Sequence, residues 1–214
     1  MKKLFFALAL LITITGNSQV KEGVITYKVE AVGQASPLAS MMGKLELVLS
    51  FKDRKSLMDM HSGMFTSKTL VNDSGVLVLM NAVSQKFFIR IPKATIAAAD
   101  TVSPKIEYTN ETRDIAGYPC KKAVITVQAG DAGVKQTVWY TDKLESISFG
   151  NDQLQLKGLK GMPLEYEMNI MQMQLKLTAL KVSTDPVPDT TFVLSTDGYQ
   201  QMDMNSLQGG GQNM

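Results

Sequence analysis

The segment "MDMHSGM" (58–64) carries three thioether sulfurs and the only imidazole of the chain. Soft thioether ligands select Cu(I), and imidazole is also a copper ligand. Met58, Met60, His61 and Met64 therefore form a candidate copper site, and copper is the one cofactor that the sequence suggests. If the segment is a strand, however, Met58 and Met60 point to one face and His61 to the other. A copper site would then require the chain to leave strand geometry before Met64.

Methionine is frequent throughout the chain, with 14 in 214 residues, and many of these residues occur in clusters. Methionine is flexible and polarizable, so it fills irregular gaps in an ordinary core. It also lines pliable apolar cavities that accept varied ligands. Copper binding by 58–64 is the third interpretation. The cavity interpretation predicts an apolar ligand, a lipid or acyl chain, held by Met58, Met60, Met168, Met171, Met173 and Leu175.

Side chains for catalysis are scarce. One histidine and one cysteine give little support to zinc sites or to Ser-His and Cys-His enzymes. Glu165 and Glu167 would serve as an acid–base pair, but alternation places both on the polar face of an amphipathic strand. Cys120 is either a small buried thiol or a reactive thiol that forms an intermolecular disulfide. We therefore expect a protein that is not an enzyme.

The N-terminus has the features of an export signal. Lys2 and Lys3 precede an apolar run from Leu4 to Ile14, and small residues end at Ser18. Residues 1–18 are therefore predicted to be a cleaved signal peptide. The apolar run is too short to span a bilayer, and no later run is longer. No cysteine near the cleavage point offers a lipid anchor, so we expect a periplasmic or secreted protein.

The charge of the chain excludes a further class of function. Lysine and arginine total 22 against 20 acidic residues, and removing Lys2 and Lys3 with the signal leaves 20 of each sign. A nucleic-acid-binding protein needs a strong basic excess. The balanced charge also gives no steering towards anionic lipids. Apolar and sulfur contacts are therefore the expected basis of ligand binding, with no nucleic-acid partner.

The chain must position these residues on strands, because period-two alternation of apolar and polar residues dominates it. Strands are expected near 25–31, 45–52, 56–62, 65–71, 76–80, 87–91, 105–109, 121–128 and 134–141. "PKATIAAAD" (92–100) is the best helix candidate. We predict a mainly β protein with one antiparallel, strongly curved sheet and one or two short helices. It would form a single domain over 19–205, followed by a disordered Gly-rich tail at 206–214.

The apolar alternation changes phase within 163–182. Leu164, Tyr166 and Met168 share one face, but after Ile170 the apolar row moves to the odd-numbered residues that begin with Met171. A bulge or a tight turn at 170–171 would explain this change. A short helix also fits part of the segment, but the regular polar alternation favours strands.

The stretches "DIAGYPCKKAVITV" (114–127), "VWYTD" (138–142) and "GLKGMPLEYEM" (158–168) resemble the secreted GLPGLI-type family and related uncharacterised periplasmic proteins. The Gly-Leu-Pro-Gly-Leu element of that family corresponds to Gly158-Leu159-Lys160-Gly161-Met162, where Lys160 replaces the proline. The ending 187–202 resembles the end of such proteins at Phe192, Gly198 and Tyr199. The resemblance implies an open half-barrel similar to that of periplasmic lipoprotein carriers, and it implies no catalytic residues.

These observations predict a non-enzymatic periplasmic binding or carrier protein for an apolar lipid or acyl-chain ligand. Two alternatives stay open. One is a copper-binding periplasmic protein that uses the 58–64 segment. The other is an accessory component of an envelope assembly, in which a sheet edge or the Gly-rich tail binds a protein partner.

Overall fold

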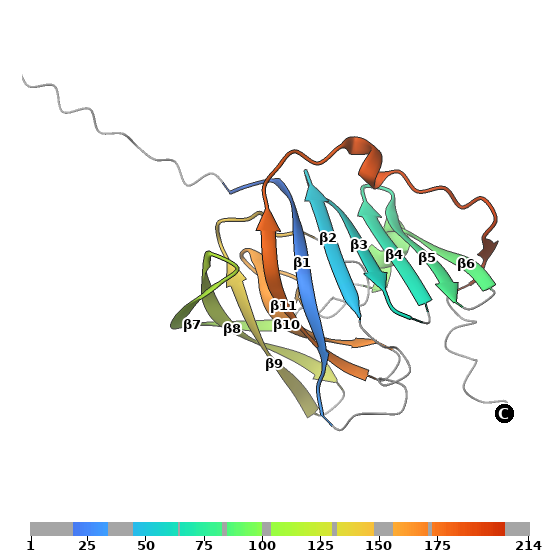
Figure 1. The fold of residues 1–214 in the computed structure, drawn as a ribbon. Coiled ribbons are helices and arrows are strands. Elements are labelled where there is room, and N and C mark those ends of the chain that lie inside the picture. Colours follow the sequence, from blue (N-terminus) through green and yellow to red (C-terminus); the bar gives the residue numbers. More distant parts are fainter. Residues whose placement is uncertain are drawn as a thin grey trace, which may run out of the picture.

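The computed structural model describes residues 19–33, 45–63, 65–82, 85–99, 104–129, 132–147, 156–170 and 173–203. Within these residues, twelve strands form one sheet (Figure 1). The first six strands are β1 (Glu22–Ala31), β2 (Glu46–Lys52), β3 (Lys55–His61), β4 (Phe65–Asn72), β5 (Gly75–Ala82) and β6 (Gln85–Pro92). The others are β7 (Lys105–Ile115), β8 (Tyr118–Ala129), β9 (Ala132–Thr141), β10 (Met162–Ile170), β11 (Met173–Ser183) and β12 (Gln200–Gln201).

The sheet has two halves that meet at β1. Its strand order is β12-β6-β5-β4-β3-β2-β1-β11-β10-β9-β8-β7. Every neighbouring pair is antiparallel except β12 and β6, which are parallel. β1 pairs with β2 on one side and β11 on the other, so the first strand joins the two halves of the sheet.

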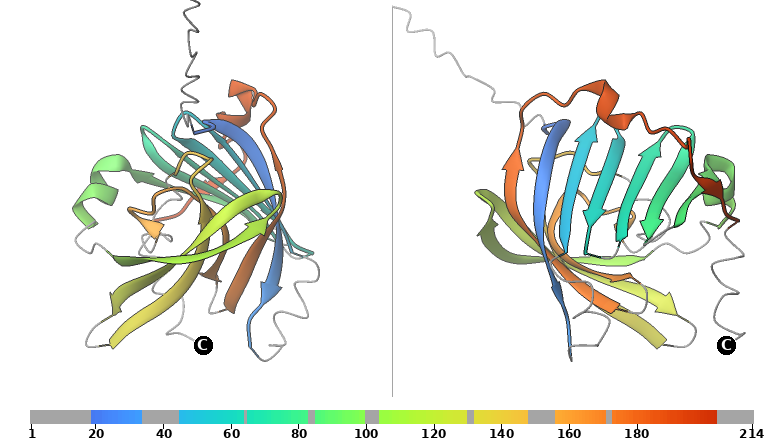
Figure 2. Two further views of the ribbon diagram at one scale, coloured as in Figure 1. Left: turned by 90° about the vertical axis from the view of Figure 1, so that its left-hand side faces the viewer. Right: turned by 45° about the vertical axis from the view of Figure 1, so that its right-hand side comes forward.

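The sheet is strongly curved and does not close, which confirms the predicted fold class. Figure 2 shows β7 to β10 bending away from the plane of β2 to β6. The bend gives the sheet an inner face, where the largest buried cluster lies. This inner core takes residues from β1 to β4 and from β7 to β11, including Ile25, Tyr27, Leu47, Leu49, Phe51, Leu164, Tyr166 and Leu177.

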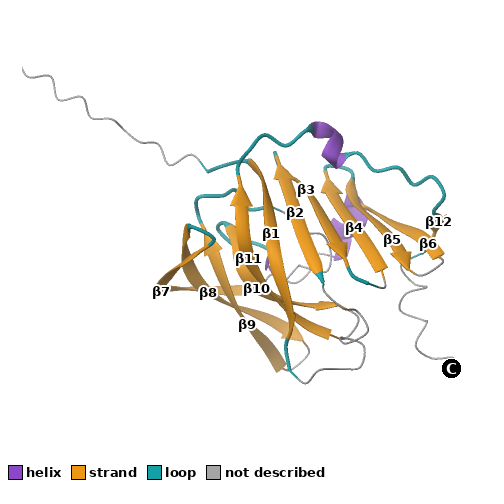
Figure 3. Ribbon diagram, in the orientation of Figure 1, coloured by secondary structure: helices purple, strands orange, loops and turns teal. Residues whose placement is uncertain are grey.

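The helical part is small. The predicted helix forms as α2 (Lys93–Ala99), directly after Pro92, and the 3₁₀ helix η2 (Asp189–Phe192) lies near the C-terminus (Figure 3). Ile96 of α2 packs against Val71, Val76 and Ile91. No helix among the described residues is long and apolar enough to cross a bilayer.

The outer face of β3 to β5 is covered by the segment 184–199, which we call the C-terminal strap. It runs from the end of β11 towards β12 at the far edge of the sheet (Figure 1). Val187 and Phe192 of the strap bury Leu57, Leu70, Leu77 and Leu79 in a second cluster. Polar contacts fix the strap at its start: Lys52 Nζ donates to the Val187 carbonyl over 2.9 Å and lies 3.2 Å from Asp189.

The phase change within 163–182 is explained by a turn between two strands. β10 ends at Ile170, β11 begins at Met173, and these two residues are antiparallel partners. A chain that reverses here presents Tyr166 and Met168 of β10 and Leu175 and Leu177 of β11 to the same inner core.

The residues that resemble the GLPGLI element have structural roles. Gly158 adopts φ +83°, a left-handed conformation that glycine accepts without strain. Gly161 lies against the Thr141 backbone so closely that a Cβ atom there would overlap the Thr141 carbonyl. Leu159 and Met162 are buried in the inner core. The element therefore brings the chain into β10 against the end of β9.

Candidate apolar ligand site

The inner face of β3 to β6 is apolar along two rows of directly opposite residues. Cross-strand partners share one face of a sheet, so the register identifies each row. The first row is Met58, Thr69, Val78 and Ile89. The second row is Met60, Ser67, Met80 and Phe87.

Burial changes along these rows. Met58 and Met60 are buried in the inner core, and Ile89 is buried beside α2. Between these two clusters, Val78, Met80 and Phe87 are only half-buried. We call Val78, Met80 and Phe87, with the hydroxyl residues Ser67 and Thr69, the inner strip. It leaves apolar side chains partly open to solvent on the concave side of the sheet.

The inner strip carries no charge. The charged side chains of β3 to β6, namely Lys55, Asp59, His61, Lys68, Lys86 and Arg90, occupy the alternate positions of their strands, which face outward. An apolar molecule on the strip would therefore displace water without stripping water from a charge.

Four of the six residues predicted for the apolar cavity lie in the inner core. Met58, Met60, Met168 and Leu175 retain 8, 5, 9 and 4% of their surface exposed. These side chains already pack against other core residues, so they form protein core. Met171 and the Met173 side chain lie outside the described part of the chain. Among the described members of the predicted set, only Met58 and Met60 border the inner strip.

The candidate copper ligands do not converge among the residues described. Met58 and Met60 point into the inner core, whereas the His61 side chain is half exposed on the opposite face. His61 Nε2 lies 2.7 Å from Asp59 Oδ1, and Lys68 Nζ lies 3.1 Å from the other oxygen of Asp59. Met64 is outside the described residues. The described residues also hold no group of three or more His, Cys, Asp or Glu side chains suited to a metal.

The carboxylate of Glu165 is the centre of a polar cluster. Its side chain is 13% exposed, and its oxygens lie 2.6 Å from Arg113, 3.2 Å from Lys176 and 3.1 Å from the Thr178 hydroxyl. The guanidinium of Arg113 also lies 4.1 Å from the centre of the Trp139 ring. Burial raises the pKa of Glu165, but hydrogen bonds from Arg113 and Lys176 outweigh it, so the pKa lies below 4.5. Glu165 is therefore held as a charged acceptor.

The lowered pKa of Glu165 predicts a loss of stability in acid. A carboxylate with a depressed folded-state pKa stabilises the fold above its unfolded-state pKa, and this contribution disappears as the pH falls through the folded-state value. We expect wild type to exceed Glu165→Gln in melting temperature at neutral pH, and the two to converge in strong acid as the pH falls through the lowered folded-state pKa of Glu165. Thermal melts across this range measure the difference. A constant difference at every pH would contradict the proposed role of the charge.

Cys120 is a buried free thiol, in keeping with the first of its two interpretations. Its Sγ donates to the Tyr118 carbonyl over 3.4 Å. Burial raises the pKa of Cys120 to about 11, so the nucleophilic thiolate is scarce at neutral pH.

Sequence reasoning missed Val78, Met80 and Phe87, although a signal was present. The run Val76-Leu77-Val78-Leu79-Met80 is apolar on both faces, a pattern typical of a strand covered on both sides. Here the odd positions pack under the C-terminal strap and the even positions face the concave side. The run therefore indicated that the inner face of β5 belongs to an apolar surface.

The comparisons with known proteins support the fold and give no family. No family model and no curated protein matches the chain, so the resemblance to the GLPGLI-type family is not confirmed. Two solved structures of PNGF-II are similar, with TM-scores of 0.55 and 0.51 and identities of 18 and 17%. Both matches cover 88% of this chain, which spans about a third of PNGF-II, at 33 and 32% of its length. LprF from Mycobacterium bovis aligns over 80% of this chain and 89% of the LprF chain at 11% identity. Its TM-score of 0.30 is too low to indicate a shared fold.

Proposed function

We propose that the protein is a non-enzymatic binding or carrier protein for an apolar ligand, a lipid or acyl chain, which it holds against the inner strip. The observation that carries the proposal is the half-buried state of Val78, Met80 and Phe87 between two buried clusters on a concave face. Ligand pockets are typically concave and mostly apolar, with few polar groups. The hydroxyls of Ser67 and Thr69 supply such groups.

The energetic basis of binding is apolar burial. Each methylene removed from water contributes about 0.8 kcal/mol, so an acyl chain gains affinity with each carbon that it places on the strip. Methionine suits this role because its side chain adapts to different ligand shapes, and Met80 lies in the middle of the strip. The site is expected to select for apolar surface and length rather than for one head group.

Binding of the neutral fluorescent probe N-phenyl-1-naphthylamine tests this proposal. The purified protein, stripped of ligand, is expected to enhance the fluorescence of the probe. Met80→Asp and Phe87→Asp should weaken binding at least tenfold, because each buries a carboxylate beneath the probe. Met80→Gln, which keeps the shape of the side chain, should have a smaller effect in the same direction.

The matched control is Leu180→Asp. Leu180 is an apolar residue of β11 with 60% of its surface exposed, and it alternates with the inward-facing Leu177 and Ala179. This variant makes the same chemical change away from the strip and should bind the probe as wild type does. Equal affinity in wild type, Met80→Asp and Leu180→Asp, with circular dichroism unchanged, would refute the inner strip as the site.

We also propose that the protein has no enzymatic activity. This proposal is supported by the ion-paired state of Glu165 and the buried thiol of Cys120, since neither group is arranged as an acid, base or nucleophile. Copper binding and a role in an envelope assembly stay alternative predictions. No contact in the described residues favours either of them.

A further inference from the structure

A pocket lies on the opposite side of the sheet from the inner strip, near the turn between β4 and β5. Its volume is about 300 Å³. Leu70 of β4 and Leu77 of β5 line one side, and Phe192 and Leu194 of the C-terminal strap line the other. The pocket exists because the strap crosses the outer face. Its lining is mixed, since Asn72 and Ser74 of the turn contribute polar surface beside the apolar side chains.

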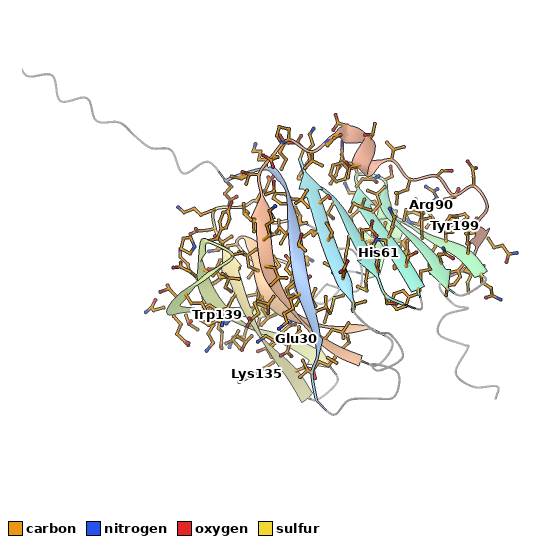
Figure 4. The ribbon with its side chains drawn as sticks, viewed as in Figure 1. Glu30, His61, Arg90, Lys135, Trp139 and Tyr199 are labelled. Carbon is orange, nitrogen blue, oxygen red and sulfur yellow. The ribbon has the colours of Figure 1, made fainter. Side chains whose placement is uncertain are left out.

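Among the described residues that line this pocket, one is charged. Arg90 of β6 is the direct cross-strand partner of Leu77, so its side chain extends from the same outer face. It is exposed, and Figure 4 shows it at the same end of the sheet as Tyr199. Among the described residues, Arg90 has no carboxylate within ion-pairing distance, and no acidic residue lines the pocket.

Several other cations of the outer surface do have carboxylate partners. Lys52 is paired with Asp189, Arg113 with Glu165, and Lys68 with Asp59. A guanidinium presents donors in a planar fork that matches a carboxylate, and such pairs are among the strongest hydrogen-bonded contacts. The guanidinium group of Arg90 is therefore available to a ligand.

The pocket joins two chemistries. The apolar side chains in its lining favour a hydrocarbon body, and Arg90 favours an anionic head. A volume of about 300 Å³ lies at the lower end of the range of small-molecule sites, so the ligand is expected to be small. Octanoate, which combines a short acyl chain with one carboxylate, is a suitable probe.

We propose that the pocket between the C-terminal strap and β4 to β6 binds a medium-chain carboxylate. The acyl chain lies in the pocket against Val193 and Leu194 of the strap, over the buried floor of Leu70, Leu77 and Phe192, and the carboxylate pairs with Arg90. The site is separate from the inner strip, because it opens on the other face of the sheet. It adds an anionic ligand class to the neutral apolar ligands expected on the concave side.

Calorimetric titration with octanoate at neutral pH and low salt tests the proposal. Wild type is expected to bind one octanoate, and Arg90→Gln should raise the Kd about tenfold or more. Octanamide has the same acyl chain but no charge, so it should bind wild type more weakly than octanoate does. Its Kd should be the same for wild type and Arg90→Gln. Added salt should weaken octanoate binding to wild type and leave octanamide binding almost unchanged.

Two further variants test whether a specific pair between Arg90 and the carboxylate, rather than overall charge or misfolding, explains the change in Kd. Lys86→Gln removes the same charge from the same face of β6, about 13 Å along the strand, and should leave the Kd of octanoate unchanged. Val193→Asp places a carboxylate at the pocket on a residue that is 74% exposed, so folding is preserved while octanoate is repelled. This variant should also weaken binding about tenfold.

The outcomes are distinct from those of the inner strip. Met80→Asp should leave octanoate binding unchanged, since Met80 faces the concave side. Three results would each overturn the proposal. They are no binding of octanoate to wild type, equal Kd values for Arg90→Gln and Lys86→Gln, and loss of octanoate binding in Met80→Asp.

Discussion

Replacing Gly161 by alanine is expected to lower the free energy of unfolding by about 3 kcal/mol. A Cβ atom at this position would overlap the carbonyl oxygen of Thr141 and lie 3.1 Å from a ring carbon of Tyr140. Thr141 is fully buried and pairs with Met162, which is also fully buried. The backbone of β9 therefore cannot move without disturbing the inner core, and interiors packed at this density do not absorb an extra methyl group.

Urea denaturation followed by fluorescence of the single tryptophan, Trp139, measures this effect. The control is Gly117→Ala. Gly117 has φ +81°, and nothing lies within 4 Å of the place that a Cβ atom would take, so alanine there meets backbone strain but no neighbour. Such strain costs about 1–2 kcal/mol. Equal losses of stability in the two variants would show that steric overlap with Thr141 is not the cause.

Truncating Tyr27 to alanine should destabilise the protein by about 4 kcal/mol, the largest effect we expect from a single core side chain. Tyr27 is 2% exposed, and its ring meets the Tyr166 ring edge-on with centroids 5.9 Å apart. Its hydroxyl donates to the Pro163 carbonyl over 2.8 Å. Because β11 lies between β1 and β10, this side chain connects strands that are not neighbours and so supports the bend of the sheet.

Tyr27→Phe separates the packing of the ring from the hydrogen bond. Burial raises the pKa of Tyr27 well above 10, so its hydroxyl stays protonated as a donor at neutral pH. Loss of that donor leaves a buried carbonyl without its partner and should cost about 1–2 kcal/mol. Tyr199→Phe, on the C-terminal strap, is the control and should be close to neutral. If Tyr27→Phe and Tyr27→Ala were equally destabilising, packing of the ring would be excluded as the main contribution.

Much of the fold was predictable because alternation reports burial directly. Ile25 and Tyr27 of β1, and Leu47 and Leu49 of β2, alternate with less buried neighbours, as the sequence pattern indicated. The loop Asn72-Asp73-Ser74-Gly75 was recognisable from its turn residues, and Gly75 does adopt a positive φ. The short helix after Pro92 followed from proline at its start and its alanines. These signals are local, so they survive without knowledge of tertiary contacts.

The candidate sites were less predictable, because they depend on segments distant in sequence. Methionine content drew attention to Met168, which lies in the inner core, and away from Met80, which lies on the inner strip. The pocket under the C-terminal strap needs Phe192 beside Leu77, and no periodicity in the sequence indicates that these two residues meet. Arg90 gave no signal of its own, since a lone arginine on an amphipathic strand normally faces solvent. Only the path of the strap gives it an apolar neighbourhood.

The position of β1 at the centre of the sheet has a consequence for how the chain folds. Val24 of β1 is opposite Ser183 of β11, so the central ladder joins residues from nearly opposite ends of the described chain. Pairings of such high contact order form slowly, and a ribosome delivers β1 long before β11. During that interval one edge of β1 is open to pairing with other chains. The sheet can therefore be completed only after β11 has been synthesised. A chaperone that binds the chain before then would protect the open edge of β1.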